Sequence, residues 1–167
     1  LVMERGDAAA ALAHFQDALR HDPRSVDARL NASVALNRIG EYATARAVCE
    51  SMSRQWPGHA GVWINLGMAC KGQRDLDGAR AAFERASVSP LARFNLGHIA
   101  LLQGDVATGL SLMEARRDVL PLGQGTHAPA WRRGERIPRR LLILPEQGMG
   151  DTILMSRFLP LLAARCD

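Results

Sequence analysis

The sequence has little of what builds a membrane protein, a disulfide-stapled domain or a β-sandwich. It has no run of about 18 apolar residues, the length that a membrane-spanning helix needs. It also has no charged N-terminal region before an apolar core, the mark of a secretory signal. The three cysteines include no Cys-x-x-Cys pair and leave one over, which argues against a disulfide framework and a metal site. Aromatic residues make up only 5% of the chain, and β-sheets favour them. We therefore expect a helical, cytoplasmic protein with no membrane span.

The charge is modest, with a net value of +4. Five arginines crowd one short stretch: Arg132, Arg133, Arg136, Arg139 and Arg140. Such a cluster could contact nucleic acid or an anionic lipid surface. We favour a solvated linker, and we expect no nucleic-acid partner, because helical repeats that read bases need a regular code of polar side chains.

What the sequence does contain is a repeat. Gly6-Asp7 recurs as Gly40-Glu41, Arg74-Asp75 and Gly104-Asp105, with steps of 34, 34 and 30 residues. Small residues keep the same spacing, at Ala11, Ala45, Ala79 and Gly109, and a further set runs through Ala18, Met52 and Ala86. A fixed period of this length is typical of stacked helical units.

Each unit is predicted to consist of a first and a second helix. Residues 60–72 carry an apolar stripe at helical spacing, and residues 75–88 carry another. Asp22-Pro23 and Trp56-Pro57 end two of the units. Ser33, Gly67 and Gly97 lie where the two helices of a unit should cross, so we expect them to let the backbones approach closely.

The segment WINLGMACKGQRDLDGARAAFERA, residues 63–86, resembles a tetratricopeptide-repeat (TPR) unit. The resemblance implies an α-α superhelix of helical hairpins over residues 1–120, about three and a half repeats, with a concave groove that binds a protein or extended peptide. Leu1 would fall inside a first helix, so the chain is expected to begin within a repeat. The fourth unit departs from the pattern: four residues are missing before it, and Arg116 replaces a small residue.

One polar residue recurs on the first helices, at Asn31, Asn65 and Asn95. An amide offers both donors and an acceptor, so it can hold a peptide backbone whatever its side chains are. TPR proteins of the O-GlcNAc transferase kind carry such a ladder, and the resemblance implies peptide binding along these three residues. The alternative is that each asparagine only bonds its own scaffold. Arg38 and Lys71 are the candidate cations of the groove.

The pattern changes near Pro121. Residues 121–138 are rich in proline and glycine and are predicted to be a linker. The apolar run Leu141-Leu142-Ile143-Leu144 predicts a buried strand, and residues 152–165 predict a helix. The turn between them lacks the lysine of a P-loop and the third glycine of a dinucleotide fingerprint. Residues 139–167 therefore predict the truncated start of a Rossmann-like domain, but without a nucleotide cradle.

The segment LLILPEQGMGDTILMSRFLPLLAAR, residues 141–165, resembles the first strand, loop and helix of bacterial TPR-linked glycosyltransferases, whose catalytic region is similar to that of heptosyltransferases. The resemblance implies an acceptor-side loop at Glu146, Gln147, Gly148 and Gly150. It implies that Asp151 is a candidate general base, while a helix cap alone is the alternative role. The half that would grip the nucleotide-sugar donor is absent, so the fragment itself is expected to be non-catalytic and to hold no cofactor.

Two interpretations of function follow. The first is a TPR interaction module of a nucleotide-sugar-dependent glycosyltransferase. The second is a stand-alone TPR adaptor whose C-terminal segment is an unrelated docking helix.

Overall fold

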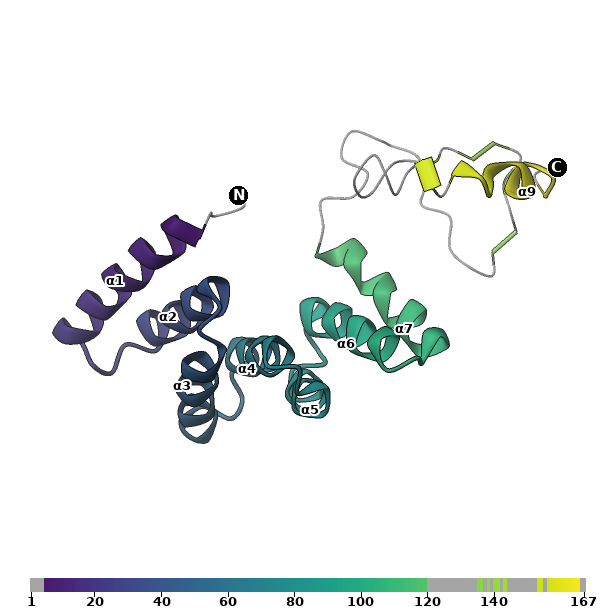
Figure 1. Ribbon diagram of the computed structural model, residues 1–167. Helices are drawn as coiled ribbons and strands as arrows, with labels where there is room; N and C mark the ends of the chain where they lie inside the picture. Colours follow the sequence, from purple (N-terminus) through teal and green to yellow (C-terminus); the bar gives the residue numbers. More distant parts are fainter. Residues whose placement is uncertain are drawn as a thin grey trace. The chain divides into compact units, whose positions relative to one another are not determined.

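The computed structural model describes residues 5–119 and, further along, residues 135, 136, 138, 140, 141, 143, 153, 154 and 156–165. The first compact unit, Leu1–Val119, is built of helices that follow one another with each beside the next (Figure 1). They are α1 (Arg5–His21), α2 (Val26–Ile39), α3 (Tyr42–Gln55), α4 (Ala60–Gly72), α5 (Leu76–Arg85), α6 (Pro90–Leu102), α7 (Val106–Met113) and the 3-10 helix η1 (Glu114–Asp118). The first helices are α2, α4 and α6, and the second helices are α1, α3, α5 and α7. The predicted repeat of helical pairs is thus confirmed for the described residues.

The recurring dipeptide is the turn between the two helices of a unit. Its first residue is left-handed in three units, with φ values of 94° at Gly40, 63° at Arg74 and 84° at Gly104. The second residue then donates its N–H to a carbonyl five residues back, as Asp75 does to Cys70 at 2.9 Å. This hydrogen-bond pattern ends a helix without leaving its carbonyls unsatisfied. The period in the sequence is therefore a period of helix ends.

The main core cluster extends across the neighbouring helices from α3 to α6. Phe83, Met52, Ile99 and Val62 are fully buried, with relative exposures of 0%. A Cβ placed on Gly67 would lie 2.5 Å from the Phe83 ring, and one on Gly97 would lie 3.0 Å from the Gly109 carbonyl oxygen. The close approach expected at these small residues is confirmed. Trp63 is half-buried, and its indole N–H donates to the Pro57 carbonyl at 2.7 Å.

The fourth unit differs from the others, as its sequence suggests. The second helix before it is shorter, with 10 residues in α5 against 14 in α3. The main packing partners of α6 are α5, α7 and η1, whereas α2 and α4 pack on each other. The helical path tightens into η1 around Arg116, which is half-buried and donates to the Met113 carbonyl at 3.1 Å. A long side chain stands where Ala86 and Met52 are buried in the preceding units, so the second helix ends earlier here.

The second compact unit, Leu120–Asp167, contains the segment that was predicted to begin a Rossmann-like domain. Leu141 and Ile143 are the described residues of the predicted strand, and neither is in a strand. No strand occurs anywhere in the described part of the chain. The expectation of a strand is therefore not supported at these two residues. The helix is supported in part, since Ile153, Leu154 and Ser156 are helical and α9 spans Leu159–Ala163.

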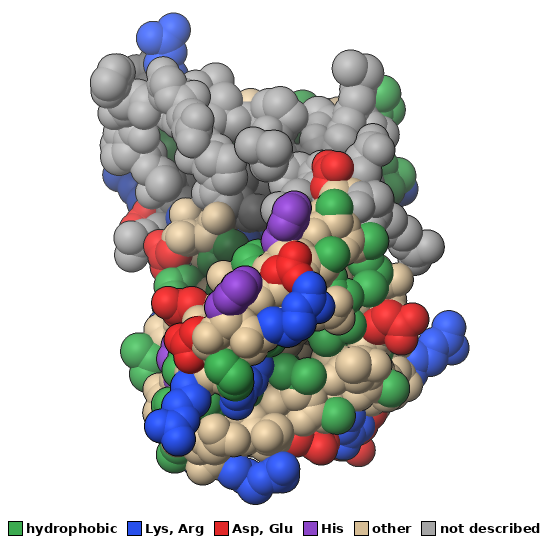
Figure 2. Space-filling model, turned by 90° about the vertical axis from the view of Figure 1, so that its left-hand side faces the viewer, with side chains coloured by type: hydrophobic (Ala, Val, Ile, Leu, Met, Phe, Trp, Pro, Cys, Tyr) green, Lys and Arg blue, Asp and Glu red, His purple; other side chains and the backbone are tan. Residues whose placement is uncertain are grey.

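The surface carries charges of both signs. On the face shown in Figure 2, basic and acidic side chains are interspersed with apolar ones, and no patch of one sign covers it. Within the described residues no helix is long and apolar enough to cross a membrane.

Candidate peptide-binding surface

Asn65, the central asparagine of the predicted row, bonds its own scaffold. Its amide nitrogen donates to the Ser33 hydroxyl at 2.9 Å, and that hydroxyl donates to the Leu30 carbonyl at 2.6 Å. Asn37 donates across the same boundary to the Asn65 carbonyl at 3.0 Å. These bonds join α2 to α4, so Asn65 contributes first to the stacking of two units.

Asn31 and Asn95 occupy equivalent positions but have different surroundings. Asn95 is buried, with 6% of its surface exposed, and donates to the Leu91 carbonyl one turn back at 2.9 Å. In the repeat before Asn95, the position of Ser33 is occupied by Gly67, which has no hydroxyl. Asn31 is exposed. A row of three exposed amides is therefore wrong for Asn95, which is buried and bonds its own helix.

The two candidate cations of the groove differ in burial. Arg38 is exposed, whereas Lys71 is half-buried, and burial lowers the pKa of the Lys71 ammonium. Lys71 also influences His98 on α6, whose pKa is lowered first by burial and then by the Lys71 charge. The His98 Nδ1 atom is buried without a hydrogen-bond partner, and its ring lies edge-on to Phe94 at 4.6 Å. The charge of Lys71 thus acts on the imidazole of His98 on the next first helix and favours its neutral form.

We call the side of α2, α4 and α6 that bears these residues the first-helix face. It comprises Asn31, Val34, Met68, Lys71, Leu91 and His98, all exposed or half-buried. Residues three positions apart share one face of a helix, which places Asn31 beside Val34 and Met68 beside Lys71. Met68 and Leu91 expose 38% and 39% of their surfaces. The face therefore combines apolar side chains with an amide, an ammonium group and an imidazole.

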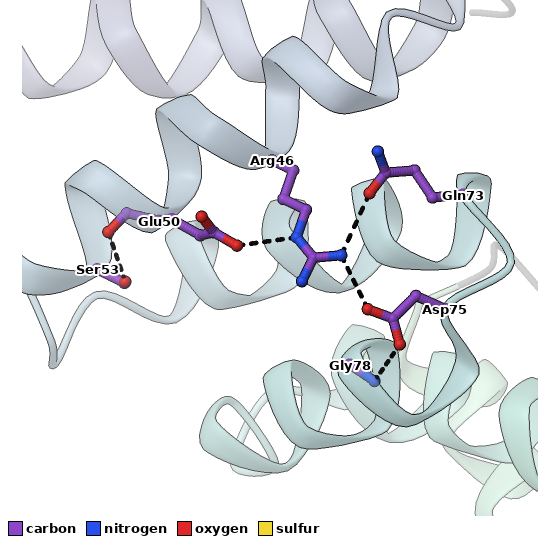
Figure 3. A network of polar contacts seen from close by, with 6 residues as sticks. All are labelled: Arg46, Glu50, Ser53, Gln73, Asp75 and Gly78. Carbon is purple, nitrogen blue, oxygen red and sulfur yellow. Dashed lines mark hydrogen bonds and ion pairs between the residues drawn. The ribbon is translucent and has the colours of Figure 1, made fainter.

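Sequence reasoning missed a polar clasp between the repeat formed by α2 and α3 and the repeat formed by α4 and α5 (Figure 3). The Arg46 guanidinium on α3 contacts Glu50 at 2.8 Å, Asp75 at 2.8 Å and Gln73 at 3.3 Å. The second carboxylate oxygen of Asp75 accepts the Gly78 N–H at 2.8 Å, which caps α5. The hydrogen bonds to Glu50 and Asp75 raise the pKa of Arg46, and those from Gly78 and Arg46 lower the pKa of Asp75.

The clasp recurs one unit later. Arg80 is equivalent to Arg46, and it donates to Gln103, which is equivalent to Gln73. Asp105, equivalent to Asp75, caps α7 by accepting the Thr108 N–H at 3.1 Å. The signal in the sequence is an arginine on a second helix, followed by Gln-x-Asp in the turn between the two helices of the next repeat.

An open groove of about 310 Å³ lies beside the clasp. It is bounded by α3 and α5, and Leu66 and Cys70 of α4 line it. Arg85 lies over the Trp63 ring at its border, 5.1 Å from the ring centroid. The small side chains of Gly78, Ala81 and Ala82 leave this space open on α5.

The predicted catalytic segment lies outside the described residues. This applies to Asp151 and to the loop residues Glu146, Gln147, Gly148 and Gly150. In the described part of the chain, no group of three or more potential metal ligands comes together.

Comparison with known proteins adds to this geometry. Residues 1–60 match the tetratricopeptide-repeat family model. Among solved structures, the chain is similar to MamA 41-end from Desulfovibrio magneticus RS-1, with 24% identity, a TM-score of 0.58 and coverage of 68% of each chain. The MamA RS-1 ArsTM double mutant gives the same values. The chain contains TPR-like helical repeats.

These TPR-like repeats agree with the repeat period and with the helical pairs described above. No curated protein sequence matches the chain. Neither the family match nor the two structures concerns a glycosyltransferase.

Proposed function

We propose that the chain is an interaction module that binds a partner protein through an extended peptide on the first-helix face. The observation that carries the proposal is the ordered stacking of TPR-like units. Stacked helical repeats have extended surfaces that serve for binding, because each repeat contacts only its neighbours and leaves one side open. A stand-alone scaffold is favoured over a module of an enzyme, since the family match and the similar structures concern the repeats.

The first-helix face supports this role through its composition. Asn31 offers an exposed amide that can bond a peptide backbone without regard to its side chains. Met68 and Leu91 offer apolar surface, and methionine adapts its shape to different partners. The Lys71 ammonium favours an acidic group in the bound peptide. Asn65 would act mainly by holding α4 on α2, whereas Asn95 bonds its own helix.

The test is selection of peptides from a random display library on the immobilised chain, followed by calorimetry with the purified peptides. The triple variant Asn31→Ala, Met68→Ala and Lys71→Ala should bind them at least about tenfold more weakly. A matched control triple, Thr44→Ala, Arg54→Ala and Glu84→Ala, changes exposed residues of α3 and α5 and should bind normally. Equal affinity of the two triples would place the binding surface elsewhere.

A second candidate role rests on the sequence motif that ends in Asp151. In a longer protein that transfers sugar, Asp151 would take the proton of the acceptor hydroxyl as general base. Asp151→Asn should then lower turnover by roughly 10²–10⁴-fold, the usual contribution of a general base. Asparagine still caps a helix, so stability should hardly change. If turnover stays within about twofold of the parent protein, Asp151 is a cap and not a base.

A further inference from the structure

The units are joined at equivalent positions. At the second junction, Tyr42 of α3 lies against Gly72 of α4, and Arg46 reaches Gln73 and Asp75. At the third junction, Arg80 of α5 reaches Gln103. The first junction has an apolar form: Leu12 and Ile39, the residues equivalent to Arg46 and Gln73, pack against one cluster of Leu36, Ala45 and Ala69. A second helix therefore uses two positions to hold the unit that follows it.

In α7 these two positions are Val106 and Leu110, and both are exposed. Val106 exposes 55% of its surface and Leu110 exposes 51%, and they lie four residues apart on one side of the helix. Gly109 is the buried residue of α7. The last helix of a stack usually turns a polar side to water. Here it carries the apolar form of a junction, with a leucine where α3 and α5 carry arginine.

The sequence after η1 does not supply a following first helix. At the spacing of the repeat such a helix would begin near residue 124, within the proline-rich and glycine-rich stretch 121–138. A second copy of the chain does not supply it either. Each first helix already has a second helix packed on it: α1 on α2, α3 on α4 and α5 on α6.

We propose that the exposed side of α7 at Val106 and Leu110 docks an amphipathic helix of a partner protein, in the place that the first helix of a next unit would take. The argument is continuity with the junctions inside the molecule. Val106 is equivalent to Tyr42, which lies against Gly72, so the docked helix packs on Val106 at the position of Gly72. Leu110 is equivalent to Leu12, so the docked helix carries an apolar residue at the position of Ile39. This surface is separate from the first-helix face.

The chain provides its own probe, because α2 ends in Ile39. A lactam-stabilised helical peptide with the sequence of residues 25–41 is labelled with a fluorophore and titrated with the full chain. Saturable binding is expected. Leu110→Arg, which introduces the residue of the equivalent positions in α3 and α5, should weaken it at least about tenfold. Arginine in place of Ile39 in the peptide should do the same. Val88→Arg is the control, since Val88 is 94% exposed in the turn before α6, and it should bind like the parent chain.

Three results would overturn the proposal. The first is absence of binding, or binding that Leu110→Arg leaves unchanged. The second is a lower melting temperature for Leu110→Arg, which would show that the chain itself already covers this side chain. The third is a dimer in sedimentation analysis that Leu110→Arg dissociates, which would make a second copy the occupant.

Discussion

Where the two helices of a unit cross, the small residue on one helix is matched in size to the residue on the other. Gly67 faces Phe83, whereas the equivalent pair in the preceding unit is Ser33 and Cys49, and in the following unit Gly97 and Met113. The position with the largest side chain, Phe83, stands opposite a residue with no side chain. The sizes of the two side chains that meet at the crossing are therefore matched within each pair, and neither position has one size in all repeats.

Gly67→Ala should destabilise the chain. The new Cβ would lie 2.5 Å from the Phe83 ring, and overpacking of this kind costs roughly 1–3 kcal/mol, partly offset by about 1 kcal/mol of helix propensity. Urea unfolding of Gly67→Ala, Phe83→Leu and the double variant measures the coupling. The double variant should lose less than the sum of the single variants, by about 0.5 kcal/mol or more. Strict additivity would mean that the two residues do not press on each other.

Arg74 is the only non-glycine residue with a positive φ in the described part of the chain, at 63°. Its side chain is exposed, so Arg74→Gly removes few contacts. Relief of the left-handed strain, less the extra entropy of glycine in the unfolded chain, should stabilise by roughly 0.5–1 kcal/mol. Gly40→Ala is the reciprocal control and should destabilise, because φ is 94° at Gly40. Thermal unfolding of both variants checks the sign, and a loss of stability in Arg74→Gly would contradict the strain argument.

At the scale of the helices, the sequence predicted where they begin and end. Asp22-Pro23, Trp56-Pro57 and the recurring Gly-Asp turn are local signals, and they gave the bounds of α1, α3 and α5 to within a few residues. The surroundings of each asparagine could not be predicted in this way. Whether Asn65 or Asn95 finds a hydroxyl depends on Ser33 or Gly67, which are separated from them by 32 and 28 residues. The Arg46 clasp was missed for the same reason, since Arg46 and Asp75 lie on different units.

The cap of α5 should make stability depend on pH. The pKa of Asp75 is lowered, first by the hydrogen bond from Gly78 and then by Arg46. A carboxyl whose pKa is lower in the folded state adds stability above its unfolded pKa of about 3.9, and this stability is lost as the pH falls through the folded value. Asp75→Asn keeps a capping side chain but removes the charge.

Urea unfolding of the parent chain and of Asp75→Asn between about pH 2 and pH 7 measures this dependence. The difference between the two should be largest near neutral pH and should vanish at the acid end. Asp105→Asn serves for comparison, because the pKa of Asp105 is lowered chiefly by hydrogen bonds with Thr108 and least by the Arg80 charge. A difference for Asp75→Asn that is the same at every pH would exclude the carboxylate as its source.

Across the whole of the first compact unit, the core is a series of clusters that passes from one repeat to the next. Cys49, Met52, Val62 and Phe83 belong to one cluster that extends to Ile99 on α6. In a stack of this kind each repeat contacts only its neighbours in the sequence. The free energy of unfolding is therefore close to a sum of contributions from the repeats and from the junctions between them. The two buried cysteines lie on adjoining helices, α3 and α4, and report on the same part of the core.

Cys49 and Cys70 should react with a thiol reagent only when the stack opens. Burial raises the pKa of Cys49 to about 11 and also raises that of Cys70, and the thiolate is the reactive form. In a Cys166→Ser variant at pH 8, disulfide-exchange reagents should label both thiols slowly in buffer and at once in denaturant. Stability should also fall as the pH rises from about 8.5 towards the folded pKa of Cys49, because the unfolded thiol ionises first. Fast labelling of the native chain would show that these helices separate readily.

The hydrogen bond between Asn65 and Ser33 determines which unit is suited to duplication. An array made by copying residues 26–59 end to end would place a serine hydroxyl beneath the asparagine of every following copy, so each boundary would repeat the bond of 2.9 Å. Copies of residues 60–89 would place Gly67 there instead, and each asparagine would turn back to its own helix as Asn95 does. A designer who wishes to lengthen this solenoid, or a genome that lengthens it by recombination, obtains joined units from the first segment and looser ones from the second.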